Sequence, residues 1–363
     1  MTTAPTLTDG TVTLRAHRGD DVQGVFEQSQ DRASQAWTVI PVPYTDADAH
    51  EFVERIVPSG WRSGSAWSFA VEVEGRYAGT VGLRDLGDGR ADLGSGSHPW
   101  VRGSGAMERA LRLLLAWGFE QRGLRTVGWS AHVGNWASRR LAWRLGFSLD
   151  GTMRQWLPQR GELRDAWVGV LLADDPREPR TTWLESPVVD GDGVRLRPVT
   201  DADVPRIVEG LADAAVQHWL AFMPRDPDER EGRAYVERAR ERLATAHTLT
   251  WAFCTPEDDR LLGVMGLYRI QEEPELGYWS HPDARGRGLT TRAARLAVGH
   301  AFDALGLDRL AAYASAPNTA SRRVLEAVGF RPAGVRRRAA RTGDGTVVDL
   351  ACYDLLAEER TPA

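Results

Sequence analysis

Residues 275–293 read ELGYWSHPDARGRGLTTRA, and residues 92–110 read DLGSGSHPWVRGSGAMERA. The two stretches share Leu-Gly, Ser-His-Pro, Arg-Gly and a further glycine in one register, displaced by 183 residues. The same displacement aligns NTASRRVLEAVGF at 318–330 with NWASRRLAWRLGF at 135–147. Self-similarity at a fixed period marks duplicated structural units, so the sequence predicts two copies of one domain.

The length of 363 residues also suits two domains of ordinary size. Between the copies lies DDPREPRTT at 174–182, a polar stretch with two prolines, which is typical of a linker. We therefore predict one domain over 1–173, a linker over 174–190 and a second domain over 191–363.

Each copy is predicted to be mixed α/β. Period-two alternation indicates strands, and longer apolar periodicity indicates helices. The expected strands are 12–15, 67–73, 78–83 and 126–131 in the first copy, and 194–197, 249–254, 261–268 and 309–314 in the second. The expected helices are 106–122 and 289–305, each after a glycine turn, and a later helix that begins near Asn135 or Asn318. That later helix ends at Gly-Phe, since glycine suits a helix C-terminus.

The composition excludes several classes of protein. All 45 basic side chains are arginine, so there is no lysine for a phosphate-binding loop, a kinase strand or a Schiff base. The net charge of −5 argues against nucleic-acid binding. With two cysteines, no export signal at the N-terminus and no apolar run of membrane length, we expect a cytoplasmic protein with no membrane partner. The histidines show no metal-ligand spacing, and no metal is expected.

The two glycine turns, 100–105 and 283–288, fall between a predicted strand and a predicted helix. Glycine lets the backbone bend so that successive amides and a helix N-terminus converge on an anion, for which a pyrophosphate is the natural occupant. A single glycine-rich turn is equally explained as a tight turn. Its duplication, with Arg102 and Arg285 beside it, favours anion binding.

Together, the quoted stretches resemble the GCN5-related N-acetyltransferases, specifically the branch that acetylates the N-termini of ribosomal proteins. The resemblance covers nearly the whole chain, twice. It implies two acyl-CoA N-acyltransferase domains in tandem, with acetyl-CoA as co-substrate and a small-molecule or peptide amine as acceptor. It also implies CoA contacts in each copy, the later Asn lying near the pantetheine arm. The candidates are Trp279, Arg285, Gly286, Arg287, Gly288, Leu289 and Asn318 in the second copy, and Arg102, Gly103, Ser104, Gly105, Ala106, Asn135 and Ser138 in the first.

The chemistry of acetyl transfer suggests the catalytic candidates. A neutral amine must attack the thioester, and Glu275 is placed to take its proton, with Asp92 as the counterpart in the first copy. Backbone donors near Tyr278, where strands of this family splay apart, are expected to polarise the carbonyl. Many relatives carry a tyrosine seven residues after the Asn to protonate the thiolate.

Here Leu325 and Ala142 occupy that position, so Ser321 and Ser138 are the predicted substitutes. The alternative is that these serines, like the Asn residues, only cap helices.

The two copies are not expected to be equivalent. Tyr278, Trp279 and Arg287 become serine, glycine and serine in the first copy, so the second is favoured as the catalytic one. Three alternatives stay open: a non-catalytic acyl-CoA-binding scaffold with one or both copies decayed, a tandem enzyme that uses another acyl-CoA, and one that acts in thiol biosynthesis. The oligomeric state is not predicted, and packing of the copies as a pseudo-dimer stays open. The acid-rich segments 41–54 and 224–237 are expected on the acceptor side.

Overall fold

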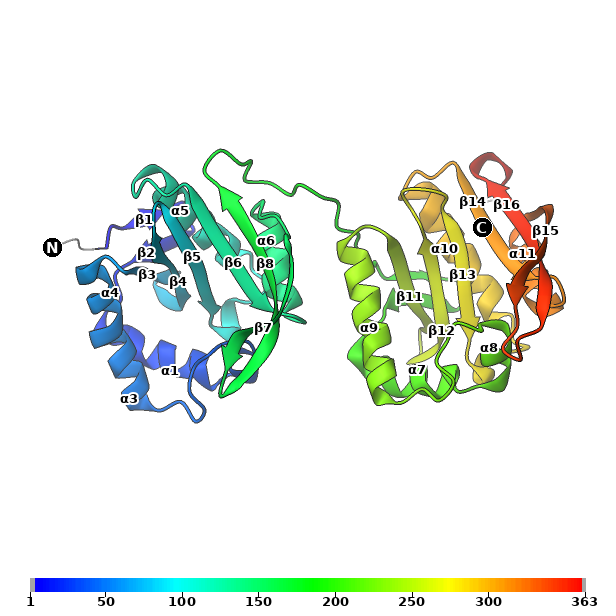
Figure 1. Cartoon of the computed structure of the whole chain (residues 1–363), viewed down its shortest axis with the longest axis horizontal. Coiled ribbons are helices and arrows are strands. Elements are labelled where there is room, and N and C mark those ends of the chain that lie inside the picture. The colour runs from blue at the N-terminus through cyan, green and yellow to red at the C-terminus, as the bar shows by residue number, and fades with distance from the viewer. Residues whose placement is uncertain (1–3, 361–363) are drawn as a thin grey trace. The chain divides into compact units, whose positions relative to one another are not determined.

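The computed structural model describes residues 4–360, and the chain divides into two compact units between Thr181 and Thr182. Each unit has one eight-stranded sheet covered by helices (Figure 1). This confirms the predicted mixed α/β class and the duplication. The division falls inside the segment 174–190, whose last two residues belong to the first strand of the second unit.

The strands pair in the order β1-β2-β3-β4-β5-β6-β8-β7 in the first unit and β15-β16-β14-β13-β12-β11-β10-β9 in the second. The first sheet consists of β1 Leu7–Thr8, β2 Val12–Arg15, β3 Ala66–Val73, β4 Arg76–Gly87, β5 Arg90–Ser97, β6 Thr126–His132, β7 Gly151–Gln159 and β8 Glu162–Leu172. The second consists of β9 Val189–Gly191, β10 Val194–Pro198, β11 Thr248–Thr255, β12 Asp258–Tyr268, β13 Glu275–Ser280, β14 Arg309–Ser315, β15 Arg331–Arg341 and β16 Val347–Leu356.

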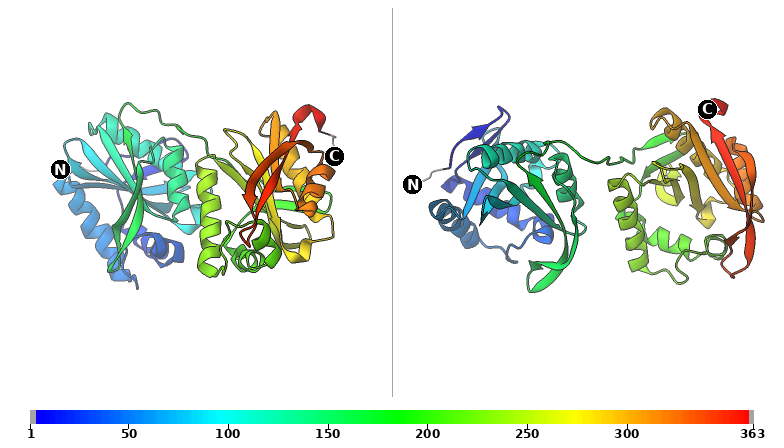
Figure 2. Two further views of the ribbon diagram at one scale, coloured as in Figure 1. Left: turned by 45° about the vertical axis from the view of Figure 1, so that its right-hand side comes forward. Right: turned by 45° about the horizontal axis from the view of Figure 1, so that its top comes forward.

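Helices cover the sheets (Figure 2). Short 3-10 helices precede several of the longer helices. The first unit has α1 Val22–Gln30, α2 Arg32–Trp37, α3 Asp46–His50, a π-helical stretch Glu51–Ile56, α4 Val57–Ser63, α5 Ala106–Glu120 and α6 Trp136–Arg144. The second has α7 Val204–Leu211, α8 Ala214–Trp219, α9 Glu229–Ala244, α10 Leu289–Asp303 and α11 Thr319–Val328. Within residues 4–360, no helix is both long and apolar enough to cross a membrane.

Strand β13 separates two apolar clusters in the second unit. Successive side chains of a strand point to opposite faces of the sheet. Leu276 and Tyr278 accordingly pack in the cluster that includes α10, whereas Trp279 packs in the cluster formed with α7 and α9. Residues of the glycine-turn stretch therefore reach both faces of the sheet.

The central parallel pairing of each sheet is short. Strand β13 pairs with β12 over six residues, but with β14 only at Glu275 and Leu276. In the first unit, β5 pairs with β6 only from Arg90 to Asp92. Beyond these points the two parallel strands separate, so the later backbone groups of β13 and β5 have no partner on the neighbouring parallel strand.

The final hairpin of each unit, β7–β8 and β15–β16, was missed by the sequence analysis. Strand β15 is almost entirely exposed and carries five arginines on the surface: Arg331, Arg336, Arg337, Arg338 and Arg341. Its sequence therefore lacks the apolar alternation that marks a half-buried strand.

A buried Arg–Asp pair fixes the start of each sheet. Arg15 donates to Asp21 at 2.7 and 2.9 Å, and Arg197 donates to Asp203 at 2.8 and 2.7 Å. Side-chain exposure is 12% for Arg197 and 4% for Asp203. The paired carboxylate also accepts from the backbone amide of Thr200, so it anchors the turn that leads into α7.

Replacing Arg197 by Met should destabilise the second unit by about 3 kcal/mol, because it leaves the buried Asp203 charge without its cation. Urea unfolding of the full chain, followed by circular dichroism, measures this change. Arg233→Met is the matched control, since Arg233 pairs with Glu229 on the exposed face of α9 and such pairs contribute little. Equal effects of the two substitutions would contradict the assigned role of the buried pair.

Candidate functional site

The glycine turn of the second unit presents unpaired backbone amides at the start of α10. Gly286 and Gly288 have φ of 71° and 70°, a left-handed conformation that favours glycine. A Cβ at either position would meet nothing within 4 Å. Within residues 4–360, the amides from Gly286 to Leu289 have no hydrogen-bond acceptor. These amides and the positive end of the α10 dipole suit an anionic group.

The turn of the first unit has the same backbone shape but fewer free amides. Gly103 and Gly105 have φ of 80° and 82°. The Ser104 amide donates to Val101 O at 3.3 Å, and the Ala106 amide donates to the Ser104 hydroxyl at 3.2 Å. Val101 O and the hydroxyl of Ser104, a predicted CoA contact, thus accept from two amides whose counterparts remain open in the second unit.

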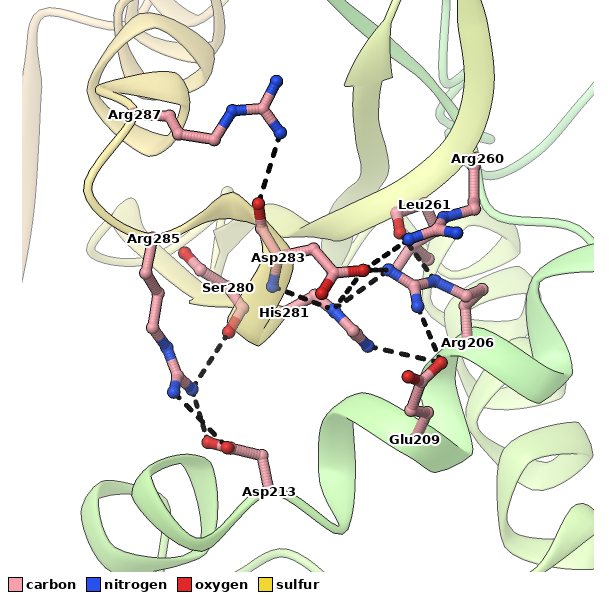
Figure 3. A network of polar contacts seen from close by, with 10 residues as sticks. All are labelled: Arg206, Glu209, Asp213, Arg260, Leu261, Ser280, His281, Asp283, Arg285 and Arg287. Atoms are coloured by element: carbon pink, nitrogen blue, oxygen red, sulfur yellow. Dashed lines mark hydrogen bonds and ion pairs between the residues drawn. The ribbon is translucent and has the colours of Figure 1, made fainter.

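The arginine of each turn forms an ion pair with the aspartate that caps a short helix, α8 in the second unit and α2 in the first. Arg285 pairs with Asp213, which caps α8 by accepting from the Val216 amide at 3.0 Å, and donates to Ser280 O at 3.4 Å (Figure 3). Arg102 pairs with Asp31 at 2.6 Å and donates to Ser97 O at 3.3 Å.

Burial alone would raise the pKa of Asp213, but the Arg285 guanidinium and the α8 amides hold it below its ordinary value. The structure therefore places Arg285 and Arg102, both predicted CoA contacts, in clamps that position the turn. Among residues 4–360, the Arg287 guanidinium instead donates only to a backbone oxygen, Asp283 O at 3.2 Å, so its remaining donors are open to a ligand.

A buried histidine beneath the turn was missed by the sequence analysis. His281 is 1% exposed, and its Nδ1 lies 2.9 Å from Arg206 Nη2 and accepts from the Asp283 amide at 3.2 Å (Figure 3). Burial and the Arg206 charge lower the pKa of His281, so the ring is neutral and serves as an acceptor. The repeated Ser-His-Pro was the available signal, because His98 likewise accepts from the Trp100 amide, at 3.5 Å.

Two predicted catalytic residues meet on the α10–α11 face. The Tyr278 hydroxyl donates to Ser321 O at 3.1 Å and lies 3.0 Å from Ser321 Oγ. Burial raises the pKa of Tyr278 to about 12, so its phenol keeps its proton at neutral pH. Asn318 caps α11, since its side-chain oxygen accepts from the Ser321 amide at 3.1 Å. Its side-chain nitrogen Nδ2 has no partner in the described chain, whereas its backbone amide donates to Ser315 O at 2.7 Å.

The first unit fills the corresponding space differently. Ser138 Oγ accepts from the indole of Trp129 at 3.0 Å, and Asn135 caps α6 by accepting from the Ser138 amide at 3.2 Å. Trp129 comes from β6, the neighbouring parallel strand, and is 7% exposed. The ring that contacts this serine thus comes from β13 in the second unit (Tyr278) and from β6 in the first (Trp129).

The carboxylates at the start of β13 and β5 differ most. Glu275 is half-buried, and within residues 4–360 its carboxylate has no hydrogen bond or ion pair; burial raises its pKa. Its counterpart Asp92 is held by Arg84 at 2.5 Å. Trp279, predicted near CoA, points to the face opposite α10, where its indole donates to the Tyr235 hydroxyl at 3.2 Å.

The acid-rich segment over 224–237 has structural partners. Asp228 caps α9 by accepting from the Glu231 amide at 2.9 Å, and Glu229 pairs with Arg233 one turn later. These acids therefore help to fix the start of α9.

Comparison with known proteins gives a match in each half. The model of the family described as "Acetyltransferase (GNAT) domain" matches residues 11–148 and 194–331. Probable N-acetyltransferase YjcK of Bacillus subtilis is 34% identical over 110 residues, which are 29% of this chain and 61% of that protein, less than two thirds of its length. Uncharacterized N-acetyltransferase YoaA of Bacillus subtilis is 25% identical over 47% of this chain and 97% of its own length. A solved structure of Mycobacterium smegmatis RimJ with CoA-disulfide is 24% identical over 47% of this chain and 85% of that chain, with a TM-score of 0.43.

Gly288→Ala should lower the free energy of unfolding by about 1 kcal/mol, because the left-handed conformation is strained for a residue with a Cβ. Gly299→Ala is the matched control, since Gly299 lies inside α10 without a positive φ and alanine favours a helix there. Thermal unfolding of both variants measures the difference. A Gly288→Ala variant as stable as Gly299→Ala would show that the turn does not need glycine.

Proposed function

Because the chain belongs to the acetyltransferase (GNAT) family, with one family domain in each half, we propose that it is an acetyl-CoA-dependent N-acetyltransferase acting on a primary amine. We assign the reaction to the second unit. One observation carries this assignment: the free amides at 286–289 and the unpaired Glu275 occur in the second unit, whereas the first unit occupies Ser104 and Ala106 amides internally and pairs Asp92 with Arg84.

The residues of the second unit suit acetyl-CoA. The backbone amides of residues 286–289 would hold the pyrophosphate, with Arg287 as the neighbouring cation. The side-chain nitrogen Nδ2 of Asn318, which has no partner in the described chain, would be available to the pantetheine arm. The amide of Tyr278, which points away from β12 and has no partner on β14, would polarise the acyl carbonyl. When bound, acetyl-CoA supplies a thioester as the acyl donor.

Glu275 is the proposed proton acceptor for the attacking amine. Its carboxylate has no cation partner among the residues that the structure describes, and burial raises its pKa, which makes it a stronger base than an ordinary glutamate. On the opposite face of β13, Tyr278 and Ser321 share a hydrogen bond and would supply a proton to the departing thiolate. In this assignment the Tyr278 phenol on β13 takes the role that many relatives give to a tyrosine at the position of Leu325 on α11.

The acceptor is proposed to be a primary amine on a small molecule or at a peptide N-terminus. The sequence resemblance to enzymes that acetylate ribosomal proteins supports the peptide. For the first unit, the ion pair between Asp92 and Arg84 favours the second candidate function, a non-catalytic domain of the same fold. Acetyl transfer by the first unit alone would exclude that assignment.

Calorimetry of the full chain with acetyl-CoA should give one binding site per chain. Gly288→Val should weaken binding more than about tenfold, because its side chain projects where the pyrophosphate would lie. The matched variant Gly105→Val alters the first unit and should leave the site intact. Two sites per chain, or loss of binding in Gly105→Val alone, would refute the assignment to the second unit.

Glu275→Gln should lower turnover about a hundredfold and leave acetyl-CoA affinity unchanged. Thiol release with a panel of small primary amines and short peptides measures it. Because only the ionised carboxylate accepts a proton, a raised pKa moves the low-pH fall in kcat/KM above the range of an ordinary glutamate. Turnover of Glu275→Gln equal to that of the parent would remove Glu275 from the mechanism.

A further inference from the structure

Glu275 faces a tyrosine across the sheet, and its counterpart in the first unit faces an arginine. Tyr268 and Glu275 are register partners of β12 and β13. At the equivalent register of β4 and β5, Arg84 is the partner of Asp92, and the two form an ion pair at 2.5 Å. Side chains opposite each other on neighbouring strands are close enough to interact directly.

Tyr268 lies over a pair of facing glycines. Gly266 and Gly277 are register partners, and a Cβ at either would come within 2.7 and 2.9 Å of the Tyr268 ring. The first unit keeps the same glycine pair, Gly82 and Gly94, yet a Cβ at Gly94 would find only a backbone oxygen at 4.0 Å. The glycines thus make room for a flat ring, which only the second unit supplies.

We propose that Tyr268 is a positioning residue that keeps the Glu275 carboxylate free of a cation, in contrast to Arg84, which pairs with the counterpart Asp92 in the first unit. This inference rests on the proposed function, in which Glu275 accepts the proton. Burial raises the pKa of Tyr268, so its phenol is neutral at working pH and brings no charge to the carboxylate. An arginine in its place would hold the carboxylate ionised in a salt bridge and remove its basicity.

The other charged groups around Glu275 already form ion pairs with one another. Arg269, the nearest cation, pairs with Glu273 at 2.8 Å, and Glu273 also meets Arg309 at 3.4 Å. Tyr313 of β14 faces the same carboxylate, and its pKa is raised by burial. On the α9 side, Tyr235 and Arg242 act on Tyr268. Glu275 is therefore the one carboxylate of this group without an ion pair in the described chain.

The test uses the full chain with Tyr268→Arg, the substitution that the first unit already accommodates at this register. The pKa of Glu275 is read from the carboxyl carbon signal of protein labelled with ¹³C-glutamate, identified by its loss in Glu275→Gln. We expect Tyr268→Arg to move the Glu275 pKa below the ordinary range of a glutamate. Tyr268→Phe, which keeps the ring and brings no cation, should retain a raised pKa.

A second cationic variant, Tyr268→Lys, brings a more flexible cation to the same register and should likewise lower the pKa of Glu275. An unchanged Glu275 pKa in Tyr268→Arg would overturn the proposal. If Tyr268→Arg fails to fold, as judged by circular dichroism, Tyr268→Lys alone decides.

Turnover separates this inference from the proposed function. Thiol release by Tyr268→Arg should fall about as far as in Glu275→Gln, while calorimetric affinity for acetyl-CoA is retained. A lowered Glu275 pKa with undiminished turnover would support the positioning role and refute Glu275 as the base. If the Glu275 pKa is unchanged in Tyr268→Arg but turnover is lost in Glu275→Gln, the positioning role of Tyr268 is refuted and Glu275 is supported as the base.

Discussion

The parallel pairing of β13 with β14 ends after Leu276, and the candidate site depends on that early end. Strand β12 pairs with β13 over six residues, so residues 277–280 have β12 as an antiparallel neighbour but no longer pair with the parallel strand β14. Side chains still alternate along this free edge. Tyr278 therefore meets Ser321 on one face, while Glu275 remains on the other. Side-chain alternation thus puts Glu275 and Tyr278 on opposite faces of the sheet, and the early end of the parallel pairing leaves the Tyr278 amide without a partner on β14.

The sequence predicted the class, the duplication and the order of elements, because glycine turns and apolar alternation are local signals repeated in one register. Helix starts at Asn135 and Asn318 followed from capping chemistry. The final hairpins were not predictable in this way, since an exposed arginine-rich strand such as β15 has no apolar period. Among the site residues, Arg285 illustrates the limit. Its place beside the turn was read correctly, but its partner Asp213 lies 72 residues away and no local pattern links them.

Comparison of the two units separates scaffolding from chemistry. The buried pair Arg15–Asp21 recurs as Arg197–Asp203, and the clamp between Arg102 and Asp31 recurs with Arg285 and Asp213. The two clamps join residues 71 and 72 positions apart in the chain. Each buried pair spans six positions, and its loss would be costly because it leaves a buried carboxylate without its cation. The residues that differ between the units lie in the glycine turn, as Arg287 and Ser104 do, or on the two central strands, as Glu275 and Asp92 do. Stability and chemistry thus rest on different side chains of the same fold.

The half-exposed Arg84–Asp92 pair illustrates what this separation permits. Pairs with this exposure add little to the free energy of folding, so forming or losing one leaves the sheet as stable as before. After a duplication, mutation could therefore silence one copy without any folding defect for selection to act on. The first unit would persist as long as its core remained under constraint, while its reactive edge was free to drift.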